Sequence, residues 1–474
     1  MTFSFEDLIA SAPLTVISLT AVVVLVVESV RDRTEGLNCW ITIGGLLVAL
    51  AAAVTSLGTS GSAYGGMLAT GGYASYFAIV FCIAGLLTVM LSRSYIAKEG
   101  IEHGEYYSLI LFAMAGMMLM AAAADLITFF LGLETMSISF YVMAGFARKR
   151  ITSNEAALKY FLLGAFATGF LLYGIALIYG STGTTRLAGI MMGLQVYSTK
   201  SLFLIGLALL MVGLAFKVAA VPFHMWVPDV YEGSPTTVSG FMSTGGKAAA
   251  FSAFLLIFSP ALVSVMGSVR EILAVLAALS MIVGNIIAIS QNNIKRMLAY
   301  SSIAHAGYIL TGIVAANAAG SNGVLFYLIT YTVMNIGAFG VLSILETSDG
   351  GNLTFDDYTG LSSRRPMLAA LMAMFMFSLS GIPPFGGFFG KYYVFAGAIE
   401  GGYTWLAIIG VLMSVVSVYY YLRLVVLMYF KDQISAADDV MPRLGITALV
   451  ISAVAVLVFG IYPSSIVSIT SHFF

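Results

Sequence analysis

Four ionisable residues stand alone in long hydrophobic stretches of the sequence: Glu134, Lys217, Lys247 and Lys391. A charge at the centre of a bilayer costs about 2.5 to 3.5 kcal/mol on the more lenient insertion scale, so four cost roughly 10 kcal/mol. Burial disfavours the charged form of any group, which brings lysines and carboxylates toward proton exchange near neutral pH. The four residues therefore predict a proton-transfer row within a membrane.

Two of the four histidines lie where they could connect the lysines. His224 follows Lys217 by seven residues, and His305 lies in another apolar stretch. Because the unperturbed pKa of histidine is about 6.5, either side chain could pass a proton from lysine to lysine. The alternative is that each is a hydrogen-bonded core residue. Histidines this scattered do not indicate a metal site.

Structural roles are the competing interpretation of the buried charges. A Glu–Lys pair can hold two helices together, and a long side chain near a helix end can reach the interface. Asp125 lies nine residues before Glu134, on the opposite helical face, and is expected to be an acid at a helix start. The run Tyr419-Tyr420-Tyr421 is expected to serve packing and the membrane interface.

Long apolar segments must position these residues. The chain has 474 residues, of which 60% are hydrophobic and 9% charged, whereas soluble domains carry about 25% charged residues. Segments long enough to span a bilayer recur throughout. The sequence predicts an all-α polytopic membrane protein of about 14 helices, with spans near 9–30, 39–57, 74–93, 106–123, 125–146, 156–180, 201–222, 235–259, 270–290, 297–316, 322–345, 366–399, 403–428 and 445–469.

Prolines interrupt the seventh and twelfth spans, at Val221-Pro222 and within 381–387. Two broken helices five spans apart predict two inverted five-helix repeats, which is a common transporter plan with ion sites at the breaks. We expect one membrane domain in which 1–105 holds helices 1–3, 106–259 the first repeat, 270–428 the second and 445–469 helix 14. Lys217 and Lys391 would then occupy matching positions.

Positive charges are distributed unevenly between the predicted loops. Cytoplasmic loops hold the excess of Lys and Arg, so alternate loops can be assigned to a side. Three lysines lie inside spans and three basic residues, Arg186, Lys200 and Arg270, lie on one side. The other side holds fifteen and is predicted to be cytoplasmic, which places both termini away from the cytoplasm: Arg31, Arg33, Arg93, Lys98, Arg148, Lys149, Arg150, Lys159, Lys295, Arg296, Arg364, Arg365, Arg423, Lys431 and Arg443.

Several functions are excluded by composition. The net charge of −1 does not suit a nucleic-acid partner. Cys39 and Cys82 are too few and too far apart for a zinc or iron–sulfur motif. Neither a dinucleotide fingerprint, a P-loop nor a nucleophile elbow occurs. We therefore expect no cofactor, no metal and no redox chemistry on this chain.

Longer motifs resemble one family over nearly the whole chain. The run from Gly213 to Pro235, GLAFKVAAVPFHMWVPDVYEGSP, is similar to the signature of the antiporter-like membrane subunits of respiratory complex I. The segments LGLE at 131–134, NIKRMLAYSSI at 293–303 and the region 381–392 are similar to others of that family. Lysine at 391 resembles the N-type branch, because M-type members carry glutamate there. L-type members add a lateral helix after helix 14.

The resemblance implies a role for each buried charge. Glu134 on helix 5 would pair with Lys217 on helix 7, and Lys247 on helix 8 would be the central relay. Lys391 on helix 12 would be the outlet lysine, with His305 and water filling the gaps. A change in the Glu134–Lys217 pair would alter proton affinity along the row.

The resemblance also implies partners and a location. NAD, FMN, iron–sulfur clusters and quinone would be bound by partner subunits of an NADH:quinone oxidoreductase that translocates protons. M-type and K-type membrane subunits would lie adjacent, in a bacterial inner membrane with its lipid. A subunit of a multisubunit sodium/proton antiporter shares these motifs and is the alternative function. A scaffold that keeps the charges only for assembly is the third.

Overall fold

The computed structural model describes residues 4–31, 36–258, 262–263, 266–347, 350–431 and 441–473. Position 259, the predicted end of the first repeat, and Arg33 lie outside these residues. Nearly everything described is helical, as the long apolar segments require. Within these described ranges, thirteen helices are long and apolar enough to cross a membrane.

Three spanning helices precede the predicted repeats: α2 (Ala12–Val30), α3 (Leu37–Ser56) and α4 (Gly72–Lys98). The next group of helices is α5 (Gly104–Ala122), α6 (Leu126–Ala144), α7 (Ile151–Thr182), α10 (Ser201–Val218), α11 (Trp226–Gly233), α12 (Thr236–Phe241) and α13 (Lys247–Ile257). A π-helical segment, Met242–Gly246, joins α12 to α13, so that Thr236–Ile257 forms one span.

The second group contains α15 (Gly267–Ile289), α16 (Ile294–Val314), α17 (Ala318–Leu345), α19 (Pro366–Ser380), α20 (Gly386–Glu400) and α21 (Thr404–Phe430), and α22 (Arg443–Ile461) follows it. The short apolar helix α19 and helix α20 are the two halves of one interrupted span. With the thirteen longer helices they give the predicted number of about 14.

Both predicted helix breaks are present. Helix α10 ends at Val218 and the chain resumes as α11 at Trp226, with Ala219 in the left-handed conformation (φ 63°). Helix α19 ends at Ser380 and is followed by Gly381 in the left-handed conformation (φ 86°), and α20 begins at Gly386. Prolines cannot donate a backbone hydrogen bond, which explains why both interruptions fall at proline-containing segments. The predicted fold class is confirmed.

Short elements that the hydropathy pattern did not predict lie between the spans. Antiparallel strands β1 (Ser60–Ala63) and β2 (Leu68–Gly71) form a hairpin that encloses the 3-10 turn Tyr64–Gly66. The remaining short elements are α1 (Phe5–Ala10), α8 (Leu187–Met192), α9 (Leu194–Tyr197), a second 3-10 turn (Asp356–Tyr358), α18 (Leu361–Arg364) and α23 (Ser464–Thr470).

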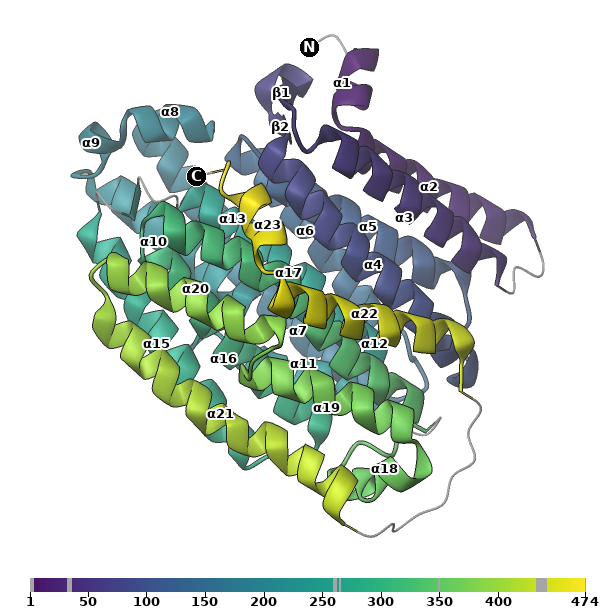
Figure 1. The fold of residues 1–474 in the computed structure, drawn as a ribbon. Coiled ribbons are helices and arrows are strands. Elements are labelled where there is room, and N and C mark those ends of the chain that lie inside the picture. The colour runs from purple at the N-terminus through teal and green to yellow at the C-terminus, as the bar shows by residue number, and fades with distance from the viewer. Residues whose placement is uncertain are drawn as a thin grey trace.

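Both chain ends lie at the same end of the helix bundle, together with the β1–β2 hairpin and α8, while α18 lies at the opposite end (Figure 1). Helix α16 is central to the second group because it packs against α11, α15, α17 and α20. It is almost completely buried, as is α17.

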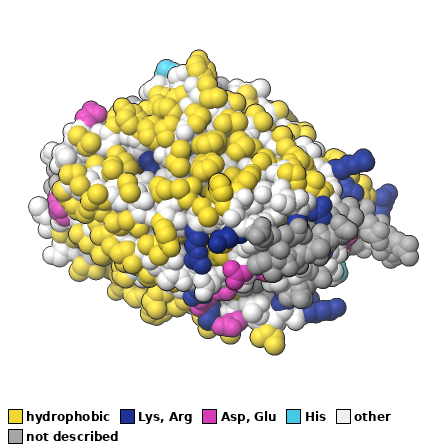
Figure 2. All heavy atoms as spheres, turned by 60° about the horizontal axis from the view of Figure 1, so that its bottom comes forward, with side chains coloured by type: hydrophobic (Ala, Val, Ile, Leu, Met, Phe, Trp, Pro, Cys, Tyr) yellow, Lys and Arg dark blue, Asp and Glu magenta, His cyan; other side chains and the backbone are white. Residues whose placement is uncertain are grey.

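The outer surface is divided by side-chain type. On the face seen in Figure 2, hydrophobic side chains form a broad area, and several Lys and Arg side chains lie with some Asp and Glu where the bottom of Figure 1 comes forward. Large exposed hydrophobic residues such as Leu162, Phe166 and Val415 lie on the spanning helices. This pattern fits a multi-pass protein whose apolar surface faces lipid or other membrane subunits.

Candidate functional site

The Lys217 ammonium lies in the last turn of α10, directly before the first break. Only 5% of Lys217 is exposed. Its Nζ donates a hydrogen bond of 2.8 Å to Ser137 Oγ and one of 3.4 Å to Tyr141 OH, both from α6. Buried charges need such partners. The partners of Lys217 therefore lie on α6, the helix that also carries Glu134.

Glu134 and Lys217, however, form no ion pair in the part of the chain that the structure describes. Ser137 lies one helical turn beyond Glu134, on the same face of α6, and it takes the position beside the ammonium. Glu134 Oε1 is buried without a hydrogen-bond partner among the described residues. The carboxylate still acts electrostatically on Lys217. The pair implied by the family resemblance is thus separated in this conformation.

Aromatic rings surround the Lys217 ammonium on the remaining sides. Nζ lies 5.4 Å from the ring centre of Tyr141, 5.6 Å from Tyr160 and 5.8 Å from Phe216. Trp226, at the start of α11, stacks on Tyr160 at 4.4 Å and donates its indole N–H to Phe216 O at 3.0 Å. The segment after the break therefore folds back over the end of α10. Ring faces attract a cation, so this pocket stabilises a charged lysine away from Glu134.

Lys247 lies at the middle of its span and is 2% exposed. It is the first residue after the π-helical segment, a distortion often found at functional sites. Its Nζ donates a short hydrogen bond to the backbone carbonyl of Ser302 on α16. No acidic side chain forms an ion pair with it within the described ranges. Lys247 thus carries a buried amine whose observed partner is neutral.

His305 lies between the two lysines of the second half of the row. It is one helical turn from Ser302, is 1% exposed, and interacts electrostatically with both Lys391 and Lys247. Both ring nitrogens have hydroxyl partners, Tyr327 OH at 2.8 Å and Tyr421 OH at 3.1 Å. The ring is therefore a hydrogen-bonded core residue and is also placed to connect the two lysines.

The Tyr419-Tyr420-Tyr421 run contains both of the roles expected for it, since two residues pack in the interior and one lies at the surface. Tyr421 is fully buried and contacts His305 and Ser301, and Tyr420 donates to Asn285 Oδ1 at 2.9 Å. Tyr419 is 61% exposed, as an interface residue would be. Hydropathy cannot separate these cases, because the three residues point to different faces of one helix.

The Lys391 ammonium forms hydrogen bonds at the second helix break. Its Nζ donates to Ser380 O, at the end of α19, and to Ser414 Oγ on α21, both at 2.8 Å. The ring of Tyr308 on α16 lies 5.0 Å from the ammonium. Because α19 ends at the break, a carbonyl in its last turn has no partner within the helix, and the Lys391 ammonium donates a hydrogen bond to it.

The expectation that Lys217 and Lys391 occupy matching positions is wrong in detail. Lys217 precedes its break, in the last turn of α10, whereas Lys391 follows its break, in the second turn of α20. Each ammonium nevertheless lies beside a helix end. A cavity of about 770 Å³ with a mainly apolar lining opens beside Lys391, between α20 and α21.

Gly387 allows the two halves of the broken helix to meet. A Cβ atom there would lie 1.9 Å from the backbone oxygen of Ser378. We expect Gly387→Ala to push α20 away from α19 and to lower the unfolding free energy by about 1–3 kcal/mol, the usual cost of overpacking. The same shift would pull Lys391, one turn further on, from Ser380 O. Thermal unfolding and proton translocation in the purified assembly measure both effects.

Gly169→Ala is the matched control, because a Cβ atom at that position meets nothing within 4 Å. Alanine is also the better helix former, by about 1 kcal/mol. Equal stability of the Gly387→Ala and Gly169→Ala proteins would show that the contact between α19 and α20 does not position Lys391.

The two remaining candidates have different surroundings. His224 lies in the first break, half-buried, and its Nδ1 has no hydrogen-bond partner among the described residues. The structure does not place it against Lys217 or Lys247. Asp125 precedes α6 and accepts from Ile127 N at 2.8 Å, so its predicted role at a helix start is confirmed.

Sequence reasoning missed the hydroxyl partners of the buried nitrogen groups, which are Ser137 and Tyr141 for Lys217, Tyr327 and Tyr421 for His305, and Ser414 for Lys391. Spacing alone offers one signal, since Glu134, Ser137 and Tyr141 repeat on one helical face. Arg150 was predicted only as one of the fifteen basic residues of the cytoplasmic side, whereas it bridges two glutamates, Glu99 and Glu346.

Comparison with known proteins identifies the family that the sequence motifs resemble. Residues 123–417 match the family described as NADH:quinone oxidoreductase/Mrp antiporter, TM. NADH-quinone oxidoreductase subunit N of Trichlorobacter lovleyi is 50% identical over 459 residues, which cover 96% of this chain and 94% of that protein. A chain of respiratory complex I from Thermus thermophilus is 36% identical with a TM-score of 0.84, covering 96% of this chain and 98% of its own.

The same fold occurs in an antiporter. A chain of the Mrp complex from Dietzia sp. superposes with a TM-score of 0.87 at 20% identity, covering 99% of this chain and 97% of its own. At that identity the likeness concerns the fold alone.

Proposed function

Because the chain belongs to the NADH:quinone oxidoreductase/Mrp antiporter transmembrane family, we propose that its buried row of charges carries protons across the membrane. The chain is an antiporter-like membrane subunit of a complex I-type, proton-translocating NADH:quinone oxidoreductase. In this proposal Glu134, Lys217, Lys247, His305 and Lys391 exchange protons in turn. Redox chemistry takes place elsewhere in the assembly and supplies the driving force.

The placement of His305 on α16, between Ser302, which binds Lys247, and Tyr308, whose ring faces Lys391, is the observation that carries the proposal. A proton that leaves Lys247 can pass to the His305 imidazole, which is hydrogen-bonded to two tyrosine hydroxyls, and then to the Lys391 amine. Each of these groups can both accept and donate a proton. A structural clamp would need paired opposite charges, and neither lysine has an ionic partner within the described residues.

In the first half of the row, proton uptake and release depend on the position of the Lys217 ammonium. Held by Ser137 and the aromatic rings, the ammonium is apart from Glu134. Movement toward Glu134 would form an ion pair that favours the charged lysine, and movement away would favour release of its proton. His224 lies at the first break, and we assign it a place on the path between the break and solvent.

The arrangement of the chain in its membrane follows from the same proposal. The fifteen basic residues of one side face the cytoplasm of a bacterial cell, so that both termini lie on the opposite face of the inner membrane. Residues 106–259 and 270–428 form the two inverted repeats.

Partners and cofactors follow from membership in the assembly. Other membrane subunits of complex I adjoin this chain, and we assign M-type and K-type subunits to its flanks. NAD, FMN, iron–sulfur clusters and quinone bind to partner subunits. The alternative function, a subunit of a sodium/proton antiporter, shares the fold but has the weaker sequence support.

Purification in mild detergent tests the function as a whole. We expect the chain to copurify with subunits that bear FMN and iron–sulfur clusters and oxidise NADH. In proteoliposomes, quinone reduction should acidify one compartment at the same rate with and without sodium. An assembly that contains only small membrane subunits and exchanges sodium for protons would contradict this function and support the antiporter.

A further inference from the structure

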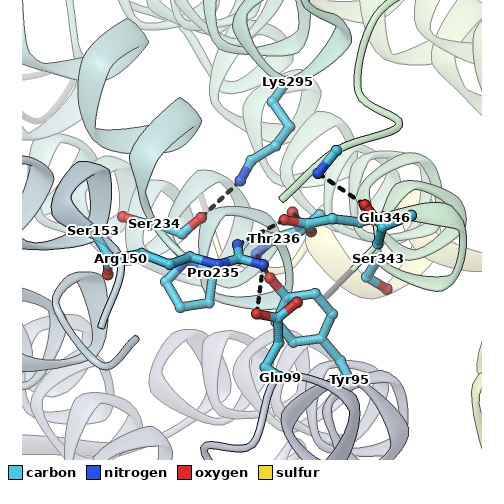
Figure 3. A network of polar contacts seen from close by, with 12 residues as sticks. Tyr95, Glu99, Arg150, Ser153, Ser234, Pro235, Thr236, Lys295, Ser343 and Glu346 are labelled. Carbon is cyan, nitrogen blue, oxygen red and sulfur yellow. Dashed lines mark hydrogen bonds and ion pairs between the residues drawn. The ribbon is translucent and has the colours of Figure 1, made fainter. Parts of the chain in front are cut away.

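Four helix ends meet at the end of the bundle opposite to the chain termini. Arg150 precedes α7, Glu99 follows α4, Glu346 follows α17, and Thr236 begins α12 (Figure 3). Glu99 and Glu346 have side chains that are 2% and 1% exposed. Buried carboxylates are rare unless they are paired or functional.

Arg150 binds both carboxylates at once. Its Nη2 lies 2.5 Å from Glu99 Oε2, and its Nη1 lies 3.0 Å from Glu346 Oε1. The second oxygen of Glu346 accepts a hydrogen bond of 2.5 Å from Thr236 Oγ1. Glu99 Oε1 is buried with no hydrogen-bond partner in the described part of the chain. One carboxylate is thus fully bonded and the other retains an open acceptor.

These charges do not stabilise their own helices. A helix carries a partial negative charge at its C-terminus and a partial positive charge at its N-terminus. Glu99 and Glu346 lie at C-termini and Arg150 at an N-terminus, so all three oppose the local dipole. Helix capping therefore does not explain the cluster.

Two cavities meet at Arg150. One, of about 690 Å³, is lined by Glu99 and Arg150 together with exposed residues such as His103. The other, of about 520 Å³, is lined by Arg150 and Glu346 together with Glu155 and other polar residues. Since one water molecule takes up about 30 Å³ of liquid, both cavities can hold several. Solvent on this side can reach the pair of glutamates.

A row of hydroxyl groups leads from Glu346 into the membrane. Thr236, Ser239 and Ser243 follow one another at spacings of three and four residues, and Lys247 comes four residues later. This spacing places all four on one helical face. Thr236, Ser239 and Ser243 are fully buried, and the row spans roughly 16 Å at 1.5 Å per residue.

Another polar side chain lies beside the row at its end nearest to Lys247. Asn335 on α17 donates a hydrogen bond of 2.8 Å to Ser243 Oγ, and its own Oδ1 has no partner in the described ranges. Successive hydroxyls one turn apart are about 5–6 Å from each other, a gap that one water molecule bridges.

We propose that Glu99 and Glu346, joined by Arg150, form a proton-loading site from which the hydroxyl row supplies Lys247. This inference rests on the proposed function and identifies where protons enter the row. Glu99 takes a proton from water in the first cavity, and the proton passes to Glu346, which leaves Glu99 ionised again. Glu346 then returns to the carboxylate as the proton crosses the row and converts the neutral amine of Lys247 to an ammonium.

The charged groups around Glu99 and Glu346 suit a site that takes up and releases a proton. Burial is the main cause that raises the pKa of Glu99 to about 7, the Arg150 guanidinium acts against it, and the Glu346 carboxylate adds to it. The other charged or titratable groups that face the cluster among the described residues are Tyr95 and Lys98 from α4, Lys295 from α16, Glu232 from α11, Tyr358, the first-cavity residues His103, Glu105, Arg148 and Lys149, and the second-cavity residues Glu155, Lys159 and Asp229. Lys98 and Lys295 bind backbone carbonyls nearby, those of Glu346 and Ser234.

Charge-removing variants of the whole assembly test the two carboxylates. Glu346→Gln should lower coupled NADH:quinone turnover and proton translocation in proteoliposomes at least tenfold. In the wild type, turnover should fall as the pH of the loading side rises through about 7, where Glu99 loses its proton. Glu99→Gln cannot ionise, so its lower rate should lack this fall. Glu102→Gln, an exposed neighbour, is the control with unchanged rate and profile.

Removal of single hydroxyls keeps the test decisive if the glutamine variants fail to assemble. Thr236→Val removes the hydroxyl that contacts Glu346 at nearly constant volume. Thr237→Val removes the neighbouring hydroxyl, which bonds to Tyr106 outside the row. We expect the first to slow translocation at least tenfold more than the second.

Two outcomes overturn the loading site. The first is that Glu346→Gln and Glu99→Gln match Glu102→Gln in rate and in pH profile, and the second is that the two valine variants translocate equally fast. If Lys247→Met still abolishes translocation in that case, only this inference fails. If Lys247→Met also translocates normally, the proposed function fails with it.

Discussion

Replacement of Lys247 with methionine is expected to stop proton translocation by this subunit while leaving it folded. Methionine keeps the length and most of the volume of the side chain, so packing around α13 should be preserved. It cannot hold a proton, and proton transfer by a positioned group is typically worth 10²–10⁴-fold. Translocation coupled to quinone reduction should therefore fall at least tenfold, as measured with a pH-sensitive dye in proteoliposomes.

The stability of the same variant should change in the opposite direction. Lys247 has no ionic partner among the described residues, and its ammonium has one backbone carbonyl, that of Ser302. Removal of an unpaired charge from this depth should stabilise the protein by up to about 3 kcal/mol. A higher unfolding temperature together with lost translocation separates function from folding.

Lys200→Met provides the control for Lys247. Lys200 precedes α10 at the surface, where its Nζ lies 4.9 Å from the ring centre of Tyr197. Its replacement should change neither translocation nor stability by much, because exposed charges contribute little. Wild-type translocation by an assembled Lys247→Met protein would remove the centre of the proposed relay.

The sequence was sufficient to predict the helices, both breaks and the lone charges. Apolar length determines a membrane span, and a charge inside such a span is conspicuous because it is costly. The breaks could be predicted because proline removes a backbone donor at a known position. Each of these signals is local in the chain.

The cluster around Arg150 could not be predicted in the same way. Its members come from positions 99, 150 and 346, and each looks like an ordinary residue at the end of a span. Nothing in the local sequence indicates that three helix ends converge. The contacts of Tyr421 with His305 and Ser301 were missed for the same reason, since they join helices more than a hundred residues apart.

The choice of Ser137 over Glu134 as the partner of Lys217 could not be predicted for a different reason. Both residues lie on one face of α6, one turn apart, and the lysine side chain is long enough to address either. A sequence shows which partners are available but not which one is occupied. The conformation seen here, with Glu134 apart from the ammonium, is one of two arrangements that this geometry allows.

Glu134→Gln should therefore abolish coupling even though the observed contacts of Lys217 would remain. Glutamine keeps the shape of glutamate and can still accept a hydrogen bond, but it offers no charge to draw the ammonium from Ser137. Lys217 would stay among Tyr141, Tyr160 and Phe216. We expect proton translocation in proteoliposomes to fall at least tenfold, with normal assembly. Glu102→Gln, at an exposed glutamate outside both cavities, is the matched control.

A double-mutant cycle with Ser137→Ala distinguishes this switch from a simple loss of charge. Ser137→Ala removes the hydrogen bond that holds Lys217 away from Glu134, so that alone it should favour the ion pair and slow translocation severalfold. Once Glu134 is glutamine, no ion pair can form, and the second substitution should cost little more. Coupled sites show such non-additivity, whereas independent sites add. If the two effects on translocation simply multiply, Ser137 and Glu134 do not compete for Lys217 and the switch between them is excluded.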